Sequence, residues 1–256
     1  MTQLAVAVSG GVDSLCALLR LREQGHDILA LHGLFLPDAA SSGVHPAPDG
    51  PRLLTAEEAL ATPLPPASRQ AVAGLQTACG QLGIPLHVAD MRAVFDREVV
   101  TPFVRAYARG RTPNPCALCN RAIKFGALLD AALSLGADRI ATGHYARLLD
   151  GPAGPMLAAA DDLAKVQRYF LSLVPLDRLR RAVFPLARQD KAASIAQVKD
   201  AGLAVPVPQE SQEICFIPAG EDAYRAFLER RWQAEGLSLP GSGPVLLEEA
   251  DSDGRP

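Results

Sequence analysis

A glycine-rich hexapeptide near the start of the chain, Ser9–Ser14 (SGGVDS), has the residue types of a phosphate-binding loop. It follows an apolar run and opens a helix-like run. Two glycines would let the backbone turn tightly there, and the free amide groups would face an anion. The serine hydroxyls add donors, and Asp13 could hold Mg²⁺ against phosphate oxygens. The spacing matches neither the GxxxxGK[ST] loop nor the GxGxxG fingerprint. The alternative interpretation is a glycine turn with a helix cap.

Three of the five cysteines lie in segments marked by Pro, Asn and Gln, which are typical of clefts. They are Cys116, Cys119 and Cys215, whereas Cys16 and Cys79 fall in apolar helical patterns and are expected to be buried. An odd number of cysteines predicts no structural disulfide framework. Thiols can carry and exchange sulfur, and a reactive thiol needs a lowered pKa. The cations that could lower the pKa of Cys119 are Arg111, Arg121 and Lys124.

The elements around these residues predict an α/β fold. Strand, glycine turn, helix and strand patterns follow one another over the first 36 residues, which is a βαβ unit. A long surface loop is expected over 37–66, with a short helix at most. The alternation then continues to about residue 150, with one strand expected in DRIATGHYARLL, and later segments read as helical. We predict a doubly wound parallel sheet over 1–160, a small, mostly helical domain over 161–238 and a flexible acidic tail over 239–256.

The composition indicates a soluble protein of the cytoplasm. The 256 residues are 48% hydrophobic, and the chain has neither an apolar run long enough to span a bilayer nor a basic leader, so no membrane partner is expected. A net charge of −3 gives no overall case for nucleic acid. Cations nevertheless outnumber acids over 105–147 and 165–199, which could form a patch for phosphates, although such runs are usually solvated faces.

The hexapeptide resembles the PP-loop of the adenylating ATP pyrophosphatases. The fold of these enzymes is called adenine nucleotide alpha-hydrolase-like. That resemblance implies cleavage of ATP between its α- and β-phosphates and transfer of AMP to a substrate oxygen. Three further segments, 111–125 (RTPNPCALCNRAIKF), 141–147 (ATGHYAR) and 210–217 (ESQEICFI), extend the similarity to the tRNA-specific 2-thiouridylases. All four motifs occur in order between about Leu4 and Leu228.

This resemblance implies ATP-dependent 2-thiolation of a tRNA wobble uridine. Cys215 matches the residue that carries sulfur as a persulfide, and Cys119 matches the partner thiol that releases it and leaves a disulfide. The sulfur would come from a persulfide donor protein or from sulfide. By the same resemblance, ATP would contact Ala7, Val8, Ser9, Gly10, Gly11, Val12, Asp13, Ser14, Gly33 and Gly143. The tRNA would contact Asn114, Pro115, His144, Lys165 and Gln167, with a structural histidine as the alternative for His144.

The chain departs from the family pattern at several positions. Cys116 stands where many members have an acid, so Cys116, Cys119 and Cys215 could instead hold a [4Fe–4S] cluster, or a zinc ion together with His144, or remain an idle dithiol. The family run Lys-Asp-Gln-Ser is here Lys165-Val166-Gln167-Arg168.

Residues 240–256 are a Pro/Gly-rich acidic tail where members of the family continue into a β-barrel that grips tRNA, so either a short form or an incomplete sequence is expected. Two alternatives to the thiouridylase therefore stay open. One is a sulfur-carrying or nucleotide- or Fe–S-binding module, and the other is a PP-loop enzyme that thiolates a small molecule.

Overall fold

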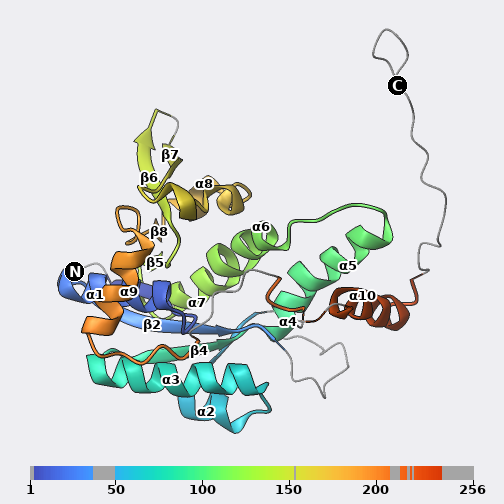
Figure 1. The fold of residues 1–256 in the computed structure, drawn as a ribbon, viewed down its shortest axis with the longest axis horizontal. Helices are drawn as coiled ribbons and strands as arrows, with labels where there is room; N and C mark the ends of the chain where they lie inside the picture. Colours follow the sequence, from blue (N-terminus) through green and yellow to red (C-terminus); the bar gives the residue numbers. More distant parts are fainter. Residues whose placement is uncertain are drawn as a thin grey trace.

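The computed structural model describes residues 3–36, 50–152, 154–207, 214–217, 220 and 222–237. A six-stranded sheet with the order β3-β4-β2-β1-β5-β8 forms its centre (Figure 1). Its parallel strands are β1 (Gln3–Ala7), β2 (Asp27–Leu34), β4 (Leu86–Asp90), β5 (Arg139–Ala141) and β8 (Ala182–Val183). Only the edge strand β3 (Arg52–Leu54) runs antiparallel to its neighbour. The predicted doubly wound parallel sheet is therefore confirmed over the first part of the chain.

Helices cover both faces of this sheet. Their bounds are α1 (Val12–Glu23), α2 (Ala56–Ala61), α3 (Pro66–Leu82), α4 (Arg92–Phe95), α5 (Thr101–Ala108), α6 (Pro115–Cys119), α7 (Leu128–Ser134), α8 (Leu176–Leu179), α9 (Lys191–Asp200) and α10 (Ala223–Ala234). Two π-helical turns, η1 (Asp96–Val100) and η2 (Asn120–Ala127), join α4 to α5 and α6 to α7. Two short 3₁₀ turns are η3 (Leu163–Lys165) and η4 (Arg168–Leu171).

Side chains of β1 alternate between two cores, as the period of a strand requires. Leu4 and Val6 point into a core with α1, α3 and α9, whereas Ala5 belongs to a core on the other face with α5, α7 and α10. Trp232 of α10 anchors that helix by donating from Nε1 to the Val104 carbonyl at 3.0 Å. The final helix predicted from AYRAFLERRWQ is thus observed, and it packs against α5.

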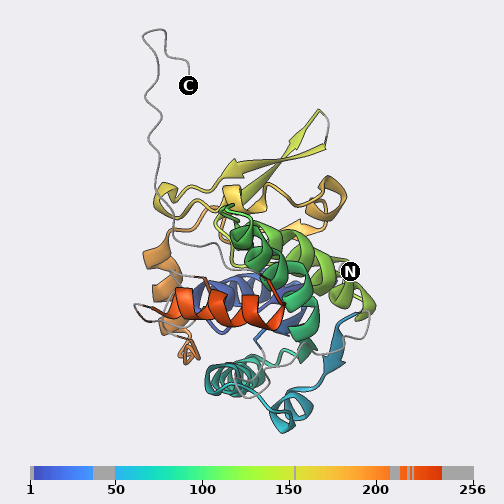
Figure 2. The ribbon, with the colours of Figure 1, turned by 90° about the vertical axis from the view of Figure 1, so that its right-hand side faces the viewer.

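The single strand expected in DRIATGHYARLL is wrong, because the chain leaves the sheet after Ala141. β5 ends there, Thr142–Tyr145 form a loop, and β6 (Ala146–Gly151) starts a separate antiparallel hairpin with β7 (Gly154–Ala159). Figures 1 and 2 both show this hairpin away from the main sheet. Thr142, Gly143 and His144 interrupt the apolar residues of this segment, and Gly143 lies close to the backbone of Asp13 in α1.

The second predicted region also differs in detail from expectation. The helical reading of 161–186 gives way to short 3₁₀ turns, α8 and the strand β8, which pairs with β5 in the main sheet. α9 packs on α1, so these segments share the core of the first region. The boundary at residue 160 stays a prediction. The loop residues 37–49 and the tail 239–256 lie outside the described residues. Among the helices that are described, none is long and apolar enough to cross a membrane.

Candidate active site

A cavity of about 890 Å³ opens at the carboxyl ends of β1, β2 and β5, where parallel sheets usually bind ligands. Of the ten residues predicted to contact ATP, all but Gly10 line it. The complete lining is Ala7, Val8, Ser9, Gly11, Val12, Asp13, Ser14, Leu31, Gly33, Phe35, Lys124, Leu128, Thr142, Gly143, His144, Tyr145, Lys165, Gln167, Lys191, Ile195 and Val207. The structure therefore brings the hexapeptide, Gly33 and Gly143 to one cavity, although they are up to 134 positions apart in sequence.

The hexapeptide folds into a turn tied together by its own hydroxyls. Ser14 Oγ donates to the Gly11 carbonyl at 2.8 Å and accepts from the Ser9 amide at 3.1 Å. Gly10 has a φ of 86°, a conformation that favours glycine, and its carbonyl accepts from Val207 at 3.0 Å. A Cβ on Gly143 would lie 2.8 Å from the Asp13 carbonyl carbon, so only glycine allows this approach. The loop is thus shaped by backbone contacts that larger residues would block.

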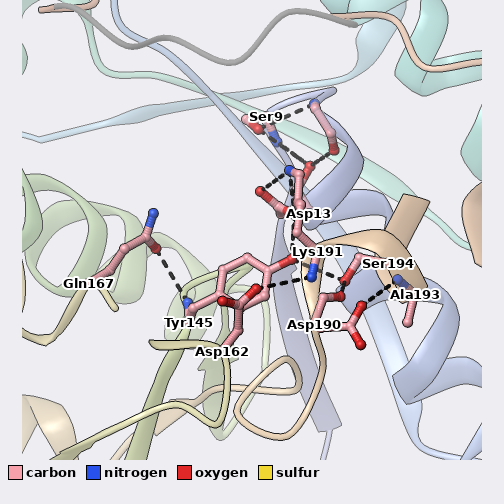
Figure 3. Close-up of polar contacts among 11 residues, drawn as sticks. Ser9, Asp13, Tyr145, Asp162, Gln167, Asp190, Lys191, Ala193 and Ser194 are labelled. Atoms are coloured by element: carbon pink, nitrogen blue, oxygen red, sulfur yellow. Dashed lines mark hydrogen bonds and ion pairs between the residues drawn. The ribbon is translucent and has the colours of Figure 1, made fainter. Parts of the chain in front are cut away.

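Asp13 is the centre of a polar network at the cavity wall (Figure 3). Lys191, the first residue of α9, donates to both carboxylate oxygens at 2.8 Å. The Tyr145 hydroxyl lies 2.9 Å from Asp13 Oδ1 and 3.0 Å from Ser194 Oγ, and burial raises the pKa of Tyr145. The backbone amide of Lys191 donates to Asp162 Oδ2 at 3.2 Å. Helix α9 is therefore fastened to the loop that begins α1.

This network bears on the predicted magnesium site. Both Asp13 oxygens accept hydrogen bonds from protein groups, so the carboxylate presents no oxygen that is free of a protein partner. A metal ion would have to compete with the Lys191 ammonium at this position. The Mg²⁺ role of Asp13 stays a prediction.

His144 is buried beside the cavity, with 7% of its surface exposed. Its Nδ1 lies 2.7 Å from Thr142 Oγ1, and Lys124 Nζ donates to its Nε2 at 3.3 Å. Burial, with a smaller contribution from the Lys124 charge, holds the pKa of His144 well below its usual range. The ring is therefore neutral near pH 7. Since Lys124 can only donate, Nδ1 carries the ring proton and donates to Thr142.

The three cysteines lie outside the cavity lining but near enough for the charge of one to act on another, so we call Cys116, Cys119 and Cys215 the cysteine cluster. Cys116 and Cys119 belong to α6, whose amide at Ala117 is capped by Asn114 Oδ1 at 3.1 Å. Negative charge on either of the other two thiols raises the pKa of Cys119. Cys116 and Cys215 are exposed and Cys119 is half-buried. The predicted pair Cys119 and Cys215 is thus brought together from positions 96 apart.

The expected lowering of the Cys119 pKa is wrong. Burial raises the pKa of Cys119 to about 12 and outweighs the opposing charge of Lys124. Desolvation by surrounding protein atoms also raises the pKa of Cys215, although part of this residue is exposed. The charge of Cys116 adds to the rise and that of Lys124 opposes it. Arg111 and Arg121 point to solvent, and neither figures among the charges that act on Cys119. Of the three cations predicted from sequence, Lys124 alone acts on this thiol.

A metal centre does not fit the arrangement of these side chains. Within the described residues, which include all three cysteines, no group of three or more His, Cys, Asp or Glu could hold a metal ion. His144, the predicted fourth zinc ligand, has both ring nitrogens engaged by Thr142 and Lys124. We therefore assign neither a [4Fe–4S] cluster nor a zinc ion to these side chains.

The residues predicted to contact tRNA divide into two groups. His144, Lys165 and Gln167 line the cavity, whereas Asn114 and Pro115 do not. Gln167 Oε1 accepts from the Tyr145 amide at 3.3 Å, so it also supports the loop after β5. Asn114 serves as the helix cap and Pro115 is buried at the first position of α6. Contact of these residues with RNA stays a prediction.

None of Lys124, Thr142, Tyr145 and Lys191 is predicted from the sequence to lie in the nucleotide cavity, although Lys124 is given a role beside Cys119. Lys124 lies in the motif 111–125 and Tyr145 in the motif 141–147. A cation and a hydroxyl next to predicted site residues are a signal from which their place in the site could have been predicted. Lys191 carries no local signal, because it is an ordinary lysine at the start of a helix and reaches Asp13 only through the packing of α9 on α1.

Comparison with known proteins identifies relatives of this chain. The family described as tRNA methyl transferase HUP domain matches residues 2–219. The tRNA-specific 2-thiouridylase MnmA of Oleidesulfovibrio alaskensis is 47% identical over 250 residues, which are 96% of this chain and 62% of that protein. The protein of the same name from Nitratidesulfovibrio vulgaris (strain DP4) is 45% identical over 244 residues, or 95% and 61% of the two chains.

A crystal structure of a 4-thiouridine synthetase in complex with RNA and bound ATP is 15% identical, has a TM-score of 0.49, and covers 92% of this chain and 51% of its own. The chain spans about three fifths of the length of the curated relatives it matches. Because the family match extends over 218 of its 256 residues, the chain belongs to the tRNA methyl transferase HUP domain family.

Proposed function

We propose that the protein catalyses ATP-dependent 2-thiolation of a tRNA uridine. One observation carries this proposal: the PP-loop cavity and the cysteine cluster share a cation, Lys124, which lines the cavity and acts on Cys119 and Cys215. An adenylating site beside a pair of thiols suits a reaction in which an activated oxygen is replaced by sulfur. The names of relatives that are 45 to 47% identical support the same reaction.

The cavity would bind ATP through the loop Ser9–Ser14 and the backbone of Gly143. The amide groups of the loop and the start of α1 would face the phosphates, since a helix N-terminus favours negative charge. Asp13 and Lys191 would lie next to the triphosphate, with the lysine balancing charge there. Attack of the uracil O2 on the α-phosphate would yield an O-adenylated base and release pyrophosphate.

The cysteine cluster would supply the sulfur. A persulfide donor, or sulfide with an oxidant, would load Cys215 as a hydropersulfide. The Cys119 thiolate would attack Cys215 Sγ, forming a Cys119–Cys215 disulfide while hydrosulfide leaves with the bonding electrons. Hydrosulfide would add to C2 of the uracil, AMP would leave with O2, and loss of the sulfur-bound proton would give the thiocarbonyl. A dithiol reductant would restore both thiols for the next turnover.

Nucleoside mass spectrometry tests this proposal. Unthiolated tRNA is incubated with the protein, Mg-ATP and a persulfide donor, and the expected product is 2-thiouridine that depends on ATP. Absence of thiolation, together with AMP and pyrophosphate formed only when a small-molecule acceptor is added, would assign the chemistry to another substrate. Absence of both would overturn the adenylating role itself.

A further inference from the structure

Lys124 lies where the adenylation step and the sulfur-transfer step of the proposed reaction would meet, and neither step alone explains its position. It lies in η2, the π-helical turn that directly continues α6, five residues after Cys119. Its side chain is half-buried and lines the nucleotide cavity on one side. Its positive charge also lowers the pKa of Cys119 and of Cys215, against the larger effect of desolvation. The same ammonium group therefore faces both the site that would activate the oxygen and the thiols that would deliver the sulfur.

The surroundings keep this ammonium charged and available. Its Nζ donates to His144 Nε2 at 3.3 Å, a bond that uses one of three donor protons and neutralises no charge. Among the residues that the structure describes, no carboxylate pairs with Lys124. Lys191 differs, because it is already paired with Asp13. A partly buried cation without a carboxylate favours an anion brought by the reaction.

His144 fixes where this ammonium group lies. The imidazole ring is held between Thr142 Oγ1 and the aromatic rings of Phe125 and Phe184, whose centroids lie 6.1 Å from its own. Phe125 and Lys124 are adjacent on η2, so the ring packs against the same turn that carries the lysine. A neutral, immobile histidine is a suitable acceptor for a lysine that must stay protonated.

We propose that Lys124 is a catalytic residue of sulfur transfer, and that its ammonium group stabilises the anionic sulfur as it passes from the cysteine cluster to the activated carbon. The inference rests on the proposed function and names the residue that links its two halves. The anions that form in turn are the Cys119 thiolate and the released hydrosulfide. Each carries one negative charge, which a single nearby ammonium can balance without a change of bonding.

Three variants separate this role from a structural one. Lys124→Met removes the charge and keeps the length, Lys124→Arg keeps the charge, and Arg121→Met removes an exposed cation from the same turn as a matched control. The first readout needs no tRNA: the rate of alkylation of each cysteine is followed against pH by peptide mass spectrometry. We expect Lys124→Met to slow alkylation of Cys119 about tenfold at each pH below the pKa of the thiol, which is a tenfold loss of thiolate. Lys124→Arg and Arg121→Met should keep the wild-type profile.

The second readout is thiolation kinetics. Lys124→Met should lower kcat at least tenfold with little change in the KM for ATP, and Lys124→Arg should recover much of kcat. An unchanged Cys119 profile in folded Lys124→Met, or a defect confined to the KM for ATP, would overturn the inference. A wild-type chain that transfers no sulfur would overturn the proposed function, whereas the alkylation profile would still report the effect of Lys124 on Cys119. Circular dichroism checks that each variant is folded.

Discussion

Single side chains at this site do more than one task, and Asp13 illustrates the point. In the loop it could bind metal, yet Lys191 and Tyr145 already hold both its oxygens. The Lys191–Asp13 pair is partly buried, with 18% and 28% of the side chains exposed. Lys191 thus balances the negative charge of a carboxylate that would otherwise repel a triphosphate. The lysine is as much a part of the proposed phosphate site as the glycines, although it comes from the other end of the sequence.

Removing this lysine should weaken binding of ATP. Lys191→Met leaves the Asp13 charge unbalanced beside the phosphates, and we expect the Kd for ATP to rise about tenfold or more, the size of one lost charge-assisted hydrogen bond. Isothermal titration calorimetry measures it. Lys199→Met provides the control, because Lys199 is exposed near the far end of α9. Equal affinities for the two variants would show that Lys191 does not face the nucleotide.

Cys215 gives a prediction with the opposite pattern. Cys215→Ser removes the proposed sulfur carrier but lies outside the cavity lining, so turnover should be lost while the Kd for ATP stays within about twofold, near the error of affinity comparisons. Thiolation assays and calorimetry on the same sample provide the comparison. Cys79→Ala, which removes a buried thiol of α3, should thiolate normally. Full activity of Cys215→Ser would exclude the thiol mechanism.

At the scale of elements, local patterns predicted more than long-range contacts did. The alternation of strand and helix, the turn at Ser9–Ser14 and the final helix all follow from periodicity and glycine placement, which act over a few residues. The end of β5 after Ala141 was not predicted, although Thr142, Gly143 and His144 interrupt the apolar residues there. It depends on how closely the loop approaches α1, a contact between residues 130 apart. The position of β8 beside β5 is equally non-local.

That close approach makes Gly143→Ala a test of how the loop after β5 supports the site. A methyl group there would lie 2.8 Å from the Asp13 carbonyl carbon and 3.0 Å from the Ser14 nitrogen, both rigid backbone atoms. We expect α1 and the loop to separate, with a loss of stability of about 1–3 kcal/mol by overpacking and a clear loss of ATP binding. Denaturant unfolding and calorimetry measure the two effects.

Gly80→Ala serves as its counterpart, since a Cβ at Gly80 of α3 meets nothing within 4 Å. Alanine is the better helix former, so this variant should gain up to about 1 kcal/mol and keep ATP binding. If Gly143→Ala behaved like Gly80→Ala, the approach of the loop to α1 would have no role in the site.

Over the whole molecule, ion pairs between distant residues neutralise part of the charge of the two basic segments. Sequence counting leaves open a phosphate patch or a solvated face over 105–147 and 165–199. In the structure several of those cations pair with acids: Arg105 with Glu235, Arg147 with Asp161, Arg178 with Asp130 and Lys191 with Asp13. The linear sequence does not reveal such pairs, because they join positions as far as 178 apart. What remains directed at the cavity is a small set of lysines rather than a broad basic face.

Two buried histidines give the folded state a dependence on pH. His32 donates from Nδ1 to the Val8 carbonyl at 2.7 Å, and burial lowers its pKa. The pKa of His144 lies well below its usual range for the same main reason. Both rings are therefore neutral in the folded protein and take up protons only on unfolding once the pH falls below about 6.5. Because the unfolded chain then binds more protons, the free energy of unfolding must decrease as the pH falls.

Below about pH 6.5 each such histidine should make the free energy of unfolding fall as the pH falls, by at most about 1.4 kcal/mol per pH unit, the value for one proton bound on unfolding. Guanidinium unfolding at several pH values measures this loss. His32→Asn, whose amide can still donate to the Val8 carbonyl, should lower the loss, because one of the two rings no longer titrates. His26→Gln, at an exposed position, should leave the loss unchanged. Equal losses in wild type and His32→Asn would mean that the ring of His32 is protonated in the folded protein as readily as in the unfolded chain.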